Sequence, residues 1–134
     1  MVHELPIRVY YEDTDAGGIV YYPNYLKFSE RGRTEFLRTL GYENSKLRED
    51  FGILFVVRHL EADYYKPCFL DDLLHMKTSV ESLKKTSFLM KQTLHRGDEM
   101  VFELLVTLVC VNAQGKPDRM PEMLRNVLTP QQET

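Results

Sequence analysis

The most regular hydrophobic pattern in the sequence follows Pro23. Apolar or small residues recur there at helical spacing, and charged residues occupy the other faces. Pro23 suits the first helical position and Gly41 suits the position just beyond the last turn, so the pattern predicts an amphipathic helix of about five turns. The apolar stripe comprises Tyr25, Phe28, Ser29, Gly32, Phe36 and Leu40. Gly32 costs about 1 kcal/mol relative to alanine in mid-helix, so we expect a sheet to pack closely against the helix there.

Most of the remaining chain alternates between apolar and polar residues, which is typical of strands. The run from Ile7 to Tyr11 predicts an opening strand, and a short helix is predicted from Asn44 to Asp50, ending at Gly52. Further strands are predicted over residues 60–65, 74–81, 87–95 and 100–112. Their connections after residue 83 are short enough for hairpins, so consecutive strands should be antiparallel.

The last predicted strand is apolar on both faces. One face carries Phe102, Leu104, Val106, Leu108 and Cys110, and the other carries Val101, Leu105, Val109 and Val111. Because one helix covers only one face of a sheet, the second face predicts another subunit packing there. The predicted fold is α+β, with a long helix packed on an antiparallel sheet of about five strands. This is the hotdog fold in outline, as a single domain over residues 1–134, with a short helix expected after Pro121.

Composition narrows the classes of function. The chain has 134 residues, 43% hydrophobic and 28% charged, which predicts one globular core. A formal net charge of −3 excludes a global basic field of the kind that binds nucleic acid. No apolar run has the length of a membrane span, and the first residues lack signal-peptide features, so we expect a cytoplasmic location. Cys68 and Cys110 lack partners at metal-ligand spacing and are expected to be free, buried thiols, and no metal or cofactor is expected.

An acidic, glycine-containing loop lies between the first strand and the long helix. The segment from Tyr11 to Tyr25 reads YEDTDAGGIVYYPNY. It closely resembles the signature of the 4-hydroxybenzoyl-CoA thioesterase family, and within that family the YbgC-type, Tol-Pal-associated acyl-CoA thioesterases. The resemblance continues through ERGRTE at residues 30–35, FVVR at 55–58, DYY at 63–65 and LDDL at 70–73. It implies a hotdog dimer that assembles further, commonly to a tetramer, and a substrate that is an acyl-CoA or an acyl carrier protein thioester.

The resemblance assigns catalysis to the second aspartate of the motif, Asp15. Thioester hydrolysis needs a base or nucleophile, and donors for the oxygen that becomes negative. The leaving thiol has a pKa of roughly 8.5, so a single carboxylate suffices, acting as a general base or as a nucleophile through a mixed anhydride. Pro23 has no N–H, so the backbone N–H of Tyr22 is the candidate oxyanion donor, the position that the family uses. Many YbgC-type members have histidine at Tyr22, and Gly18 is expected to let the backbone pass close to the thioester.

Coenzyme A also brings phosphates. In the aromatic thioesterases that the chain resembles, basic residues at the turn between two long strands meet the nucleotide. This chain offers Lys84, Lys85, Thr86 and Ser87 at that turn. As point charges, the lysines would attract phosphate without orienting it. The alternative is an ordinary solvated hairpin tip.

Other interpretations of the loop are weaker. Asp13 and Asp15 occupy the first and third positions of a calcium-loop pattern, but Gly17 and Asn24 occupy the fifth and twelfth, which does not fit. Asp13 is expected to be structural, accepting backbone N–H bonds. Dehydration of hydroxyacyl thioesters is disfavoured because no histidine lies between residues 3 and 59. A non-catalytic acyl-thioester or protein-binding module of an envelope-associated complex stays open, and the sequence does not give the acyl length.

Overall fold

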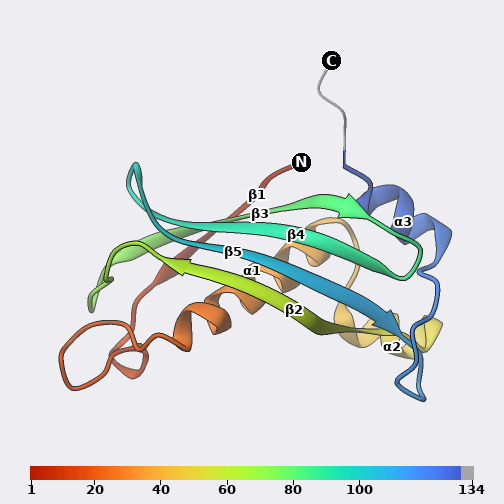
Figure 1. Cartoon of the computed structure of the whole chain (residues 1–134), viewed down its shortest axis with the longest axis horizontal. Helices are drawn as coiled ribbons and strands as arrows, with labels where there is room; N and C mark the ends of the chain where they lie inside the picture. Colours follow the sequence, from red (N-terminus) through yellow and green to blue (C-terminus); the bar gives the residue numbers. More distant parts are fainter. Residues whose placement is uncertain (131–134) are drawn as a thin grey trace.

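The computed structural model describes residues 1–130 and shows a five-stranded antiparallel sheet with one long helix lying across it (Figure 1). The strands are β1 (His3–Arg8), β2 (Leu54–Tyr64), β3 (Leu73–Leu83), β4 (Ser87–Arg96) and β5 (Glu99–Val111). The helices are α1 (Asn24–Thr39), α2 (Asn44–Phe51) and α3 (Glu122–Leu128), with a 3₁₀ turn η1 (Tyr11–Asp13). The strand order is β1-β3-β4-β5-β2, so β1 and β2 form the two edges. The predicted α+β architecture and the two hairpins are confirmed.

Helix boundaries agree with the signals in the sequence. Pro23 directly precedes α1, and Gly41 follows its end with φ +95°, a left-handed conformation that glycine adopts without a steric penalty. Gly52 likewise ends α2 with φ +66°. The helix predicted from Asn44 therefore ends before the predicted glycine. The helix predicted after Pro121 is observed as α3.

Two predicted strand boundaries are wrong. The first strand ends at Arg8 rather than Tyr11, because Asp13 Oδ2 accepts the N–H of Tyr10 at 2.8 Å and bends the chain into η1. The second strand begins at Leu54 rather than near residue 60. Both halves of β2 pair regularly with β5. The first half was missed because a bulge after Val57 interrupts the alternation of apolar and polar residues along the strand.

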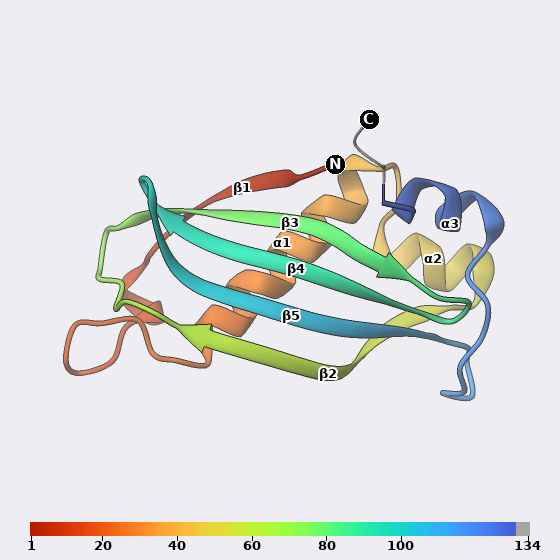
Figure 2. The same cartoon turned by 45° about the horizontal axis from the view of Figure 1, so that its top comes forward.

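The close approach predicted at Gly32 is confirmed. A Cβ atom at this position would lie 2.8 Å from Cγ of Met76 and 2.9 Å from Nε2 of Gln92. Gln92 is fully buried and cannot easily yield, because its Nε2 donates to the carbonyl of Ser29 at 2.8 Å and to Thr78 Oγ1 at 3.0 Å. The helix therefore packs directly on β3 and, at Gln92, on β4 (Figure 2).

The other face of the sheet differs from the expectation. Val101, Val109 and Val111 are buried within the chain itself, and Leu105 is half-buried. These side chains therefore give no reason to place a second subunit on that face. The exposed apolar surface lies instead along β2, where Val56, Val57, Leu60 and Tyr64 are each 38–47% exposed.

No helix within residues 1–130 is both long enough and apolar enough to cross a membrane. Cys68 and Cys110 are free and buried, as predicted. The last four residues, 131–134, lie outside the part of the chain that the structure describes.

Candidate active site

The Asp15 loop is closed by its own backbone. Thr14 and Val20 form an isolated antiparallel bridge across its base. Inside the loop, the Asp15 N–H donates to the carbonyl of Ile19 at 3.0 Å, and the Gly18 N–H donates to the carbonyl of Asp15 at 3.0 Å. Gly18 has φ +79°, which explains why glycine occupies this position. The motif is therefore a built turn and not a loose solvated connection.

The carboxylate of Asp15 is oriented through one of its two oxygens. Oδ1 accepts the N–H of Gly17 at 2.9 Å, an Asx-type turn. Oδ2 has no hydrogen-bond or ion-pair partner within residues 1–130, and the side chain is exposed. One carboxylate oxygen is thus available to a water molecule or to an electrophile.

The backbone of Tyr22 is held on one side of its Cα atom and free on the other. Its carbonyl accepts the hydroxyl of Tyr64, the last residue of β2, at 3.2 Å. Its N–H finds no acceptor among the described residues, and the next residue, Pro23, carries no N–H. This N–H lies at the start of α1, where the positive end of the helix dipole favours developing negative charge.

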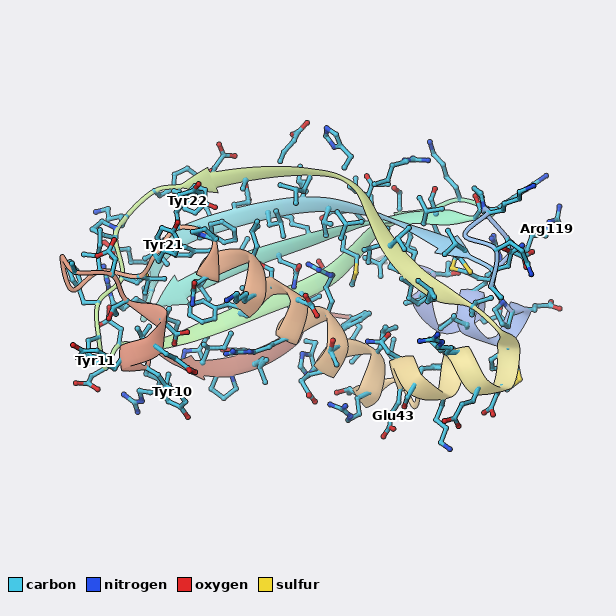
Figure 3. The ribbon with its side chains drawn as sticks, turned by 90° about the horizontal axis from the view of Figure 1, so that it is seen from below. Tyr10, Tyr11, Tyr21, Tyr22, Glu43 and Arg119 are labelled. Carbon is cyan, nitrogen blue, oxygen red and sulfur yellow. The ribbon has the colours of Figure 1, made fainter. Side chains whose placement is uncertain are left out.

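The aromatic residues around the helix start divide into two groups. Tyr25 is core, 4% exposed and packed on Phe102, with its pKa raised by burial and by its contact with Cys68, so it stays protonated. Tyr21 and Tyr22 are 50% and 65% exposed and meet edge to face at 5.3 Å. Figure 3 shows them beside the end of β2. Of these three tyrosines, only Tyr25 therefore belongs to the core.

The predicted phosphate-binding residues occupy the β3–β4 turn and have unpredicted basic neighbours. Lys85, Arg119 and Arg125 line a recess of about 280 Å³ together with Met120 and Glu122. Arg125 Nη1 donates to the carbonyls of Lys84 at 2.8 Å and Lys85 at 3.3 Å, which fixes the turn. Arg119 and Arg125 were not identified from the sequence, because more than thirty residues separate them from the lysines and no local pattern connects them.

Thr86 and Ser87 do not share this recess. The carbonyl of Thr86 accepts the N–H of Cys110 at 2.8 Å, and Ser87 is 5% exposed. Ser87 lines a separate small recess with Lys84 and Arg58, another basic residue that the sequence did not single out.

The two predicted parts of the site, the Asp15 loop and the lysine turn, lie at opposite ends of the sheet within one protomer. The Asp15 loop adjoins the C-terminal end of β2 and the start of β3, whereas Lys84 follows the end of β3. An eleven-residue strand spans about 36 Å. In Figure 3, Tyr22 and Arg119 are correspondingly at opposite ends of the sheet. The structure therefore places Asp15, Gly18 and Tyr22 in the segment that leads into α1 but does not bring Lys84 and Lys85 to them within one protomer.

A cavity of about 310 Å³ opens at the cationic end, between α1, α2 and the first half of β2. Its lining residues are Glu30, Arg33, Thr34, Leu37, Asn44, Leu54, Phe55, Val57 and Leu108. Arg33 is held against the sheet by Gln92 Oε1, to which its Nη1 donates at 2.9 Å. Within residues 1–130, no group of three or more histidine, cysteine, aspartate or glutamate side chains is placed to bind a metal ion.

Comparison with known proteins identifies the family and the fold. The sequence model of the thioesterase-like superfamily matches residues 9–128. The acyl-CoA thioesterase YbgC of Haemophilus influenzae is 44% identical over 121 residues, which cover 90% of this chain and 89% of that protein. The structure of a probable thioesterase from Bartonella henselae superposes with a TM-score of 0.86 at 40% identity, covering 90% of this chain and 100% of that one. A 4-hydroxybenzoyl-CoA thioesterase complexed with 4-hydroxybenzoyl-CoA shares the fold, with a TM-score of 0.89 at 19% identity, covering 96% of this chain and 99% of that one.

Proposed function

Because the chain belongs to the thioesterase-like superfamily, and within it to the YbgC-type acyl-CoA thioesterases, we propose that it hydrolyses acyl-CoA thioesters through Asp15. One observation carries the assignment of the residue. Asp15 presents a carboxylate oxygen that is unpaired among residues 1–130, and its loop leads to the Tyr22 N–H at the start of α1, which is likewise unpaired there. A nucleophile or base and an oxyanion donor are the two groups that thioester hydrolysis requires.

The chemistry can take either of two routes. As a general base, Asp15 accepts a proton from water while the water oxygen adds to the thioester carbonyl. As a nucleophile, its carboxylate adds to that carbonyl, the thiolate departs, and water then cleaves the mixed anhydride. Both routes release a free acid and the coenzyme A thiol, and both place negative charge on the same carbonyl oxygen.

The Tyr22 N–H is proposed as the donor to that oxygen. Its orientation is set from the other side of its peptide unit, where the Tyr21 carbonyl accepts the N–H of Asn24 at 2.8 Å. A backbone donor of this kind is worth about 2.7 to 4 kcal/mol in the transition state. The role requires no particular side chain, so tyrosine in place of the histidine of many relatives is compatible with it.

The site is incomplete in one chain, and the free edge of β2 suggests how a second copy completes it. β2 is eleven residues long, pairs only with β5 among the described strands, and exposes apolar side chains. A long apolar edge strand is a template for pairing with another strand. We propose that two copies pair their β2 strands antiparallel about a two-fold axis, which gives a dimer with a continuous sheet.

The two-fold axis would bring together the parts that one chain keeps apart. Antiparallel pairing sets the Tyr64 end of one β2 beside the Leu54 end of its partner. The Leu54 end pairs with Val111 and therefore lies at the same end of the sheet as Lys84, Lys85 and the 310 Å³ cavity. The Asp15 of one protomer would then face the cavity and the cationic turn of the other, with the phosphates of coenzyme A at that turn.

Four further expectations also remain proposals. The cytoplasmic location is compatible with the free thiols of Cys68 and Cys110. Pairing of dimers into tetramers and association with an envelope complex rest on the family resemblance, and acyl carrier protein is an alternative carrier of the acyl group.

A thiol-release assay tests the proposal. The wild type is expected to hydrolyse members of a panel of short, long and aromatic acyl-CoAs, and Asp15→Asn is expected to lose at least about a hundredfold in kcat. Asp50→Asn, an exposed aspartate on α2, is the matched control and should keep wild-type turnover. Wild-type rates in Asp15→Asn would remove Asp15 from the mechanism, and no release from any acyl-CoA or acyl carrier protein substrate would favour a binding module.

A further inference from the structure

The Asp15 loop contacts the segment that connects β2 to β3, residues 65–72. The N–H of Val20 donates to the carbonyl of Cys68 at 2.8 Å, and Ile19 forms a bridge with Phe69. These contacts lie next to the loop's own closing bridge at Val20. A displacement of the connecting segment would therefore displace the loop.

The connecting segment is not held by regular secondary structure. It contains Asp71 at φ +71°, a conformation that costs a non-glycine residue free energy of order 1 kcal/mol and that persists only where the surroundings hold it. On one side the segment is tied to the end of β1, because the Asp71 N–H donates to the carbonyl of Val9 at 3.0 Å. On the other side the Lys66 N–H donates to the carbonyl of Val101 on β5 at 3.2 Å, and the remaining ties are made by one side chain of β4, Arg96.

Arg96 is the last residue of β4 and contacts the connecting segment in three ways. Its Nη1 donates to the carbonyl of Pro67 at 3.0 Å and to Asp72 Oδ2 at 3.0 Å. Its guanidinium also lies over the ring of Phe69, with Cζ 5.8 Å from the ring centroid. Asp72 Oδ2 accepts the N–H of Phe69 at 2.9 Å as well, so Arg96 and Asp72 fix both the backbone and the ring of Phe69.

The guanidinium of Arg96 is itself held in place by Glu99. Its Nη2 donates to Glu99 Oε1 at 2.7 Å across the β4–β5 turn, and Lys66 pairs with the other oxygen of Glu99 at 3.1 Å. In Figure 1, the β4–β5 turn, the β2–β3 connection and the loop before α1 lie at the same end of the sheet. A planar guanidinium can serve these partners together, whereas a lysine ammonium cannot reproduce the fork or the stacking.

We propose that Arg96 is a positioning residue for the reaction, which holds the Asp15 loop through Phe69 and Cys68. This inference rests on the proposed role of Asp15. Arg96 does not itself reach the carboxylate. Arg96 acts on the position of the Asp15 loop, so removing its side chain should lower kcat more than it changes KM.

The test combines hydrogen exchange with kinetics on Arg96→Ala, Arg96→Lys and, as a matched control, Arg48→Ala on the exposed face of α2. In Arg96→Ala, the amides of Asp15, Gly18 and Val20 should exchange at least about tenfold faster, while amides in the middle of β5 keep wild-type rates. The kcat for an acyl-CoA should fall about tenfold or more, because small displacements of a reacting group cost orders of magnitude, with KM changed less than twofold. Arg96→Lys should restore neither property fully, and Arg48→Ala should match the wild type in both.

Three results for Arg96→Ala would overturn the inference. The first is unchanged hydrogen exchange in the Asp15 loop, and the second is a kcat equal to that of Arg48→Ala. The third is an equal acceleration of exchange in the loop and in β5, which would indicate general destabilisation. The exchange measurement does not depend on activity. A wild type that hydrolyses no thioester would therefore overturn the proposed function while the coupling of Arg96 to the loop is still decided by exchange.

Discussion

Asp13 Oδ1 accepts a hydrogen bond from the side-chain amide of Asn24 at 3.0 Å, in an environment where both residues are buried. The other carboxylate oxygen of Asp13 accepts the N–H of Tyr10, and its carbonyl accepts the N–H of Tyr21. Asp13 thus joins the end of β1, the base of the Asp15 loop and the first residue of α1. Its predicted structural role is confirmed, and Asp15 lies two residues later in the loop whose base Asp13 contacts.

Removing that contact should destabilise the fold. Asp13→Ala leaves the buried Asn24 amide and the part-buried Tyr10 N–H without an acceptor, so the free energy of unfolding should fall by about 2 to 4 kcal/mol. Denaturant titration measures this change. The neighbouring Glu12→Ala is exposed and should stay within about 0.5 kcal/mol of the wild type. Equal stabilities for the two variants would show that Asp13 does not hold the loop.

Dimerisation through β2 can be tested by introducing a charged residue on this strand. Val57→Lys places a cation on the exposed apolar part of this strand, where two copies would bring like charges and unpaired polar groups together. Light scattering after gel filtration should give a dimeric mass or a multiple of it for the wild type and a monomeric mass for the variant, with kcat lowered because the site is composite. Met123→Lys on α3, where the methionine is 75% exposed, should change neither. An unaltered mass for Val57→Lys would place the interface elsewhere.

The cationic turn should act on the phosphates and not on the thioester. Lys85→Ala should raise KM for an acyl-CoA by roughly two- to fivefold, the effect of losing one exposed ion pair, and leave kcat unchanged. The same acyl group on pantetheine, which lacks the nucleotide phosphates, should show no difference between variant and wild type. Lys46→Ala on α2 serves as the control for lost positive charge. A rise in KM for both substrates would contradict phosphate recognition at this turn.

The pH dependence of stability should contain a contribution from His95. Burial, then the nearby Lys77, lowers the pKa of His95 below its ordinary value of 6.5, with His75 acting in the same direction and Glu4 in the opposite one. The unfolded chain therefore binds this proton more readily than the folded chain. Stability is unaffected by His95 well above pH 6.5 and decreases as the pH falls from 6.5 through the lowered pKa. In His95→Gln, the loss of stability between pH 8 and pH 5 should be smaller than in the wild type, as measured by thermal denaturation in both buffers, and an equal loss would contradict this assignment.

Much of the fold follows from local signals. The ends of α1 and α2 are set by local backbone conformation, at Pro23 before α1, Gly41 after it and Gly52 after α2. Because these effects involve only neighbouring residues, the bounds of both helices could be predicted almost to the residue. The alternation in β3, β4 and β5 specifies which side chains face α1. The half of β2 before its bulge escaped prediction, because alternation shifts by one residue there.

The sequence by itself determined the family, the helix and strand content, and the motif that singles out Asp15 and Tyr22. Only the tertiary structure decided that the lysine turn lies at the far end of the sheet, that Arg119 and Arg125 join it, that the exposed apolar edge is β2, and that Arg96 holds Phe69. The physical reason is that periodicity encodes the face on which a side chain lies but not the order of strands or the end of the sheet at which a turn falls. Those relationships arise when residues far apart in the chain pack around one core.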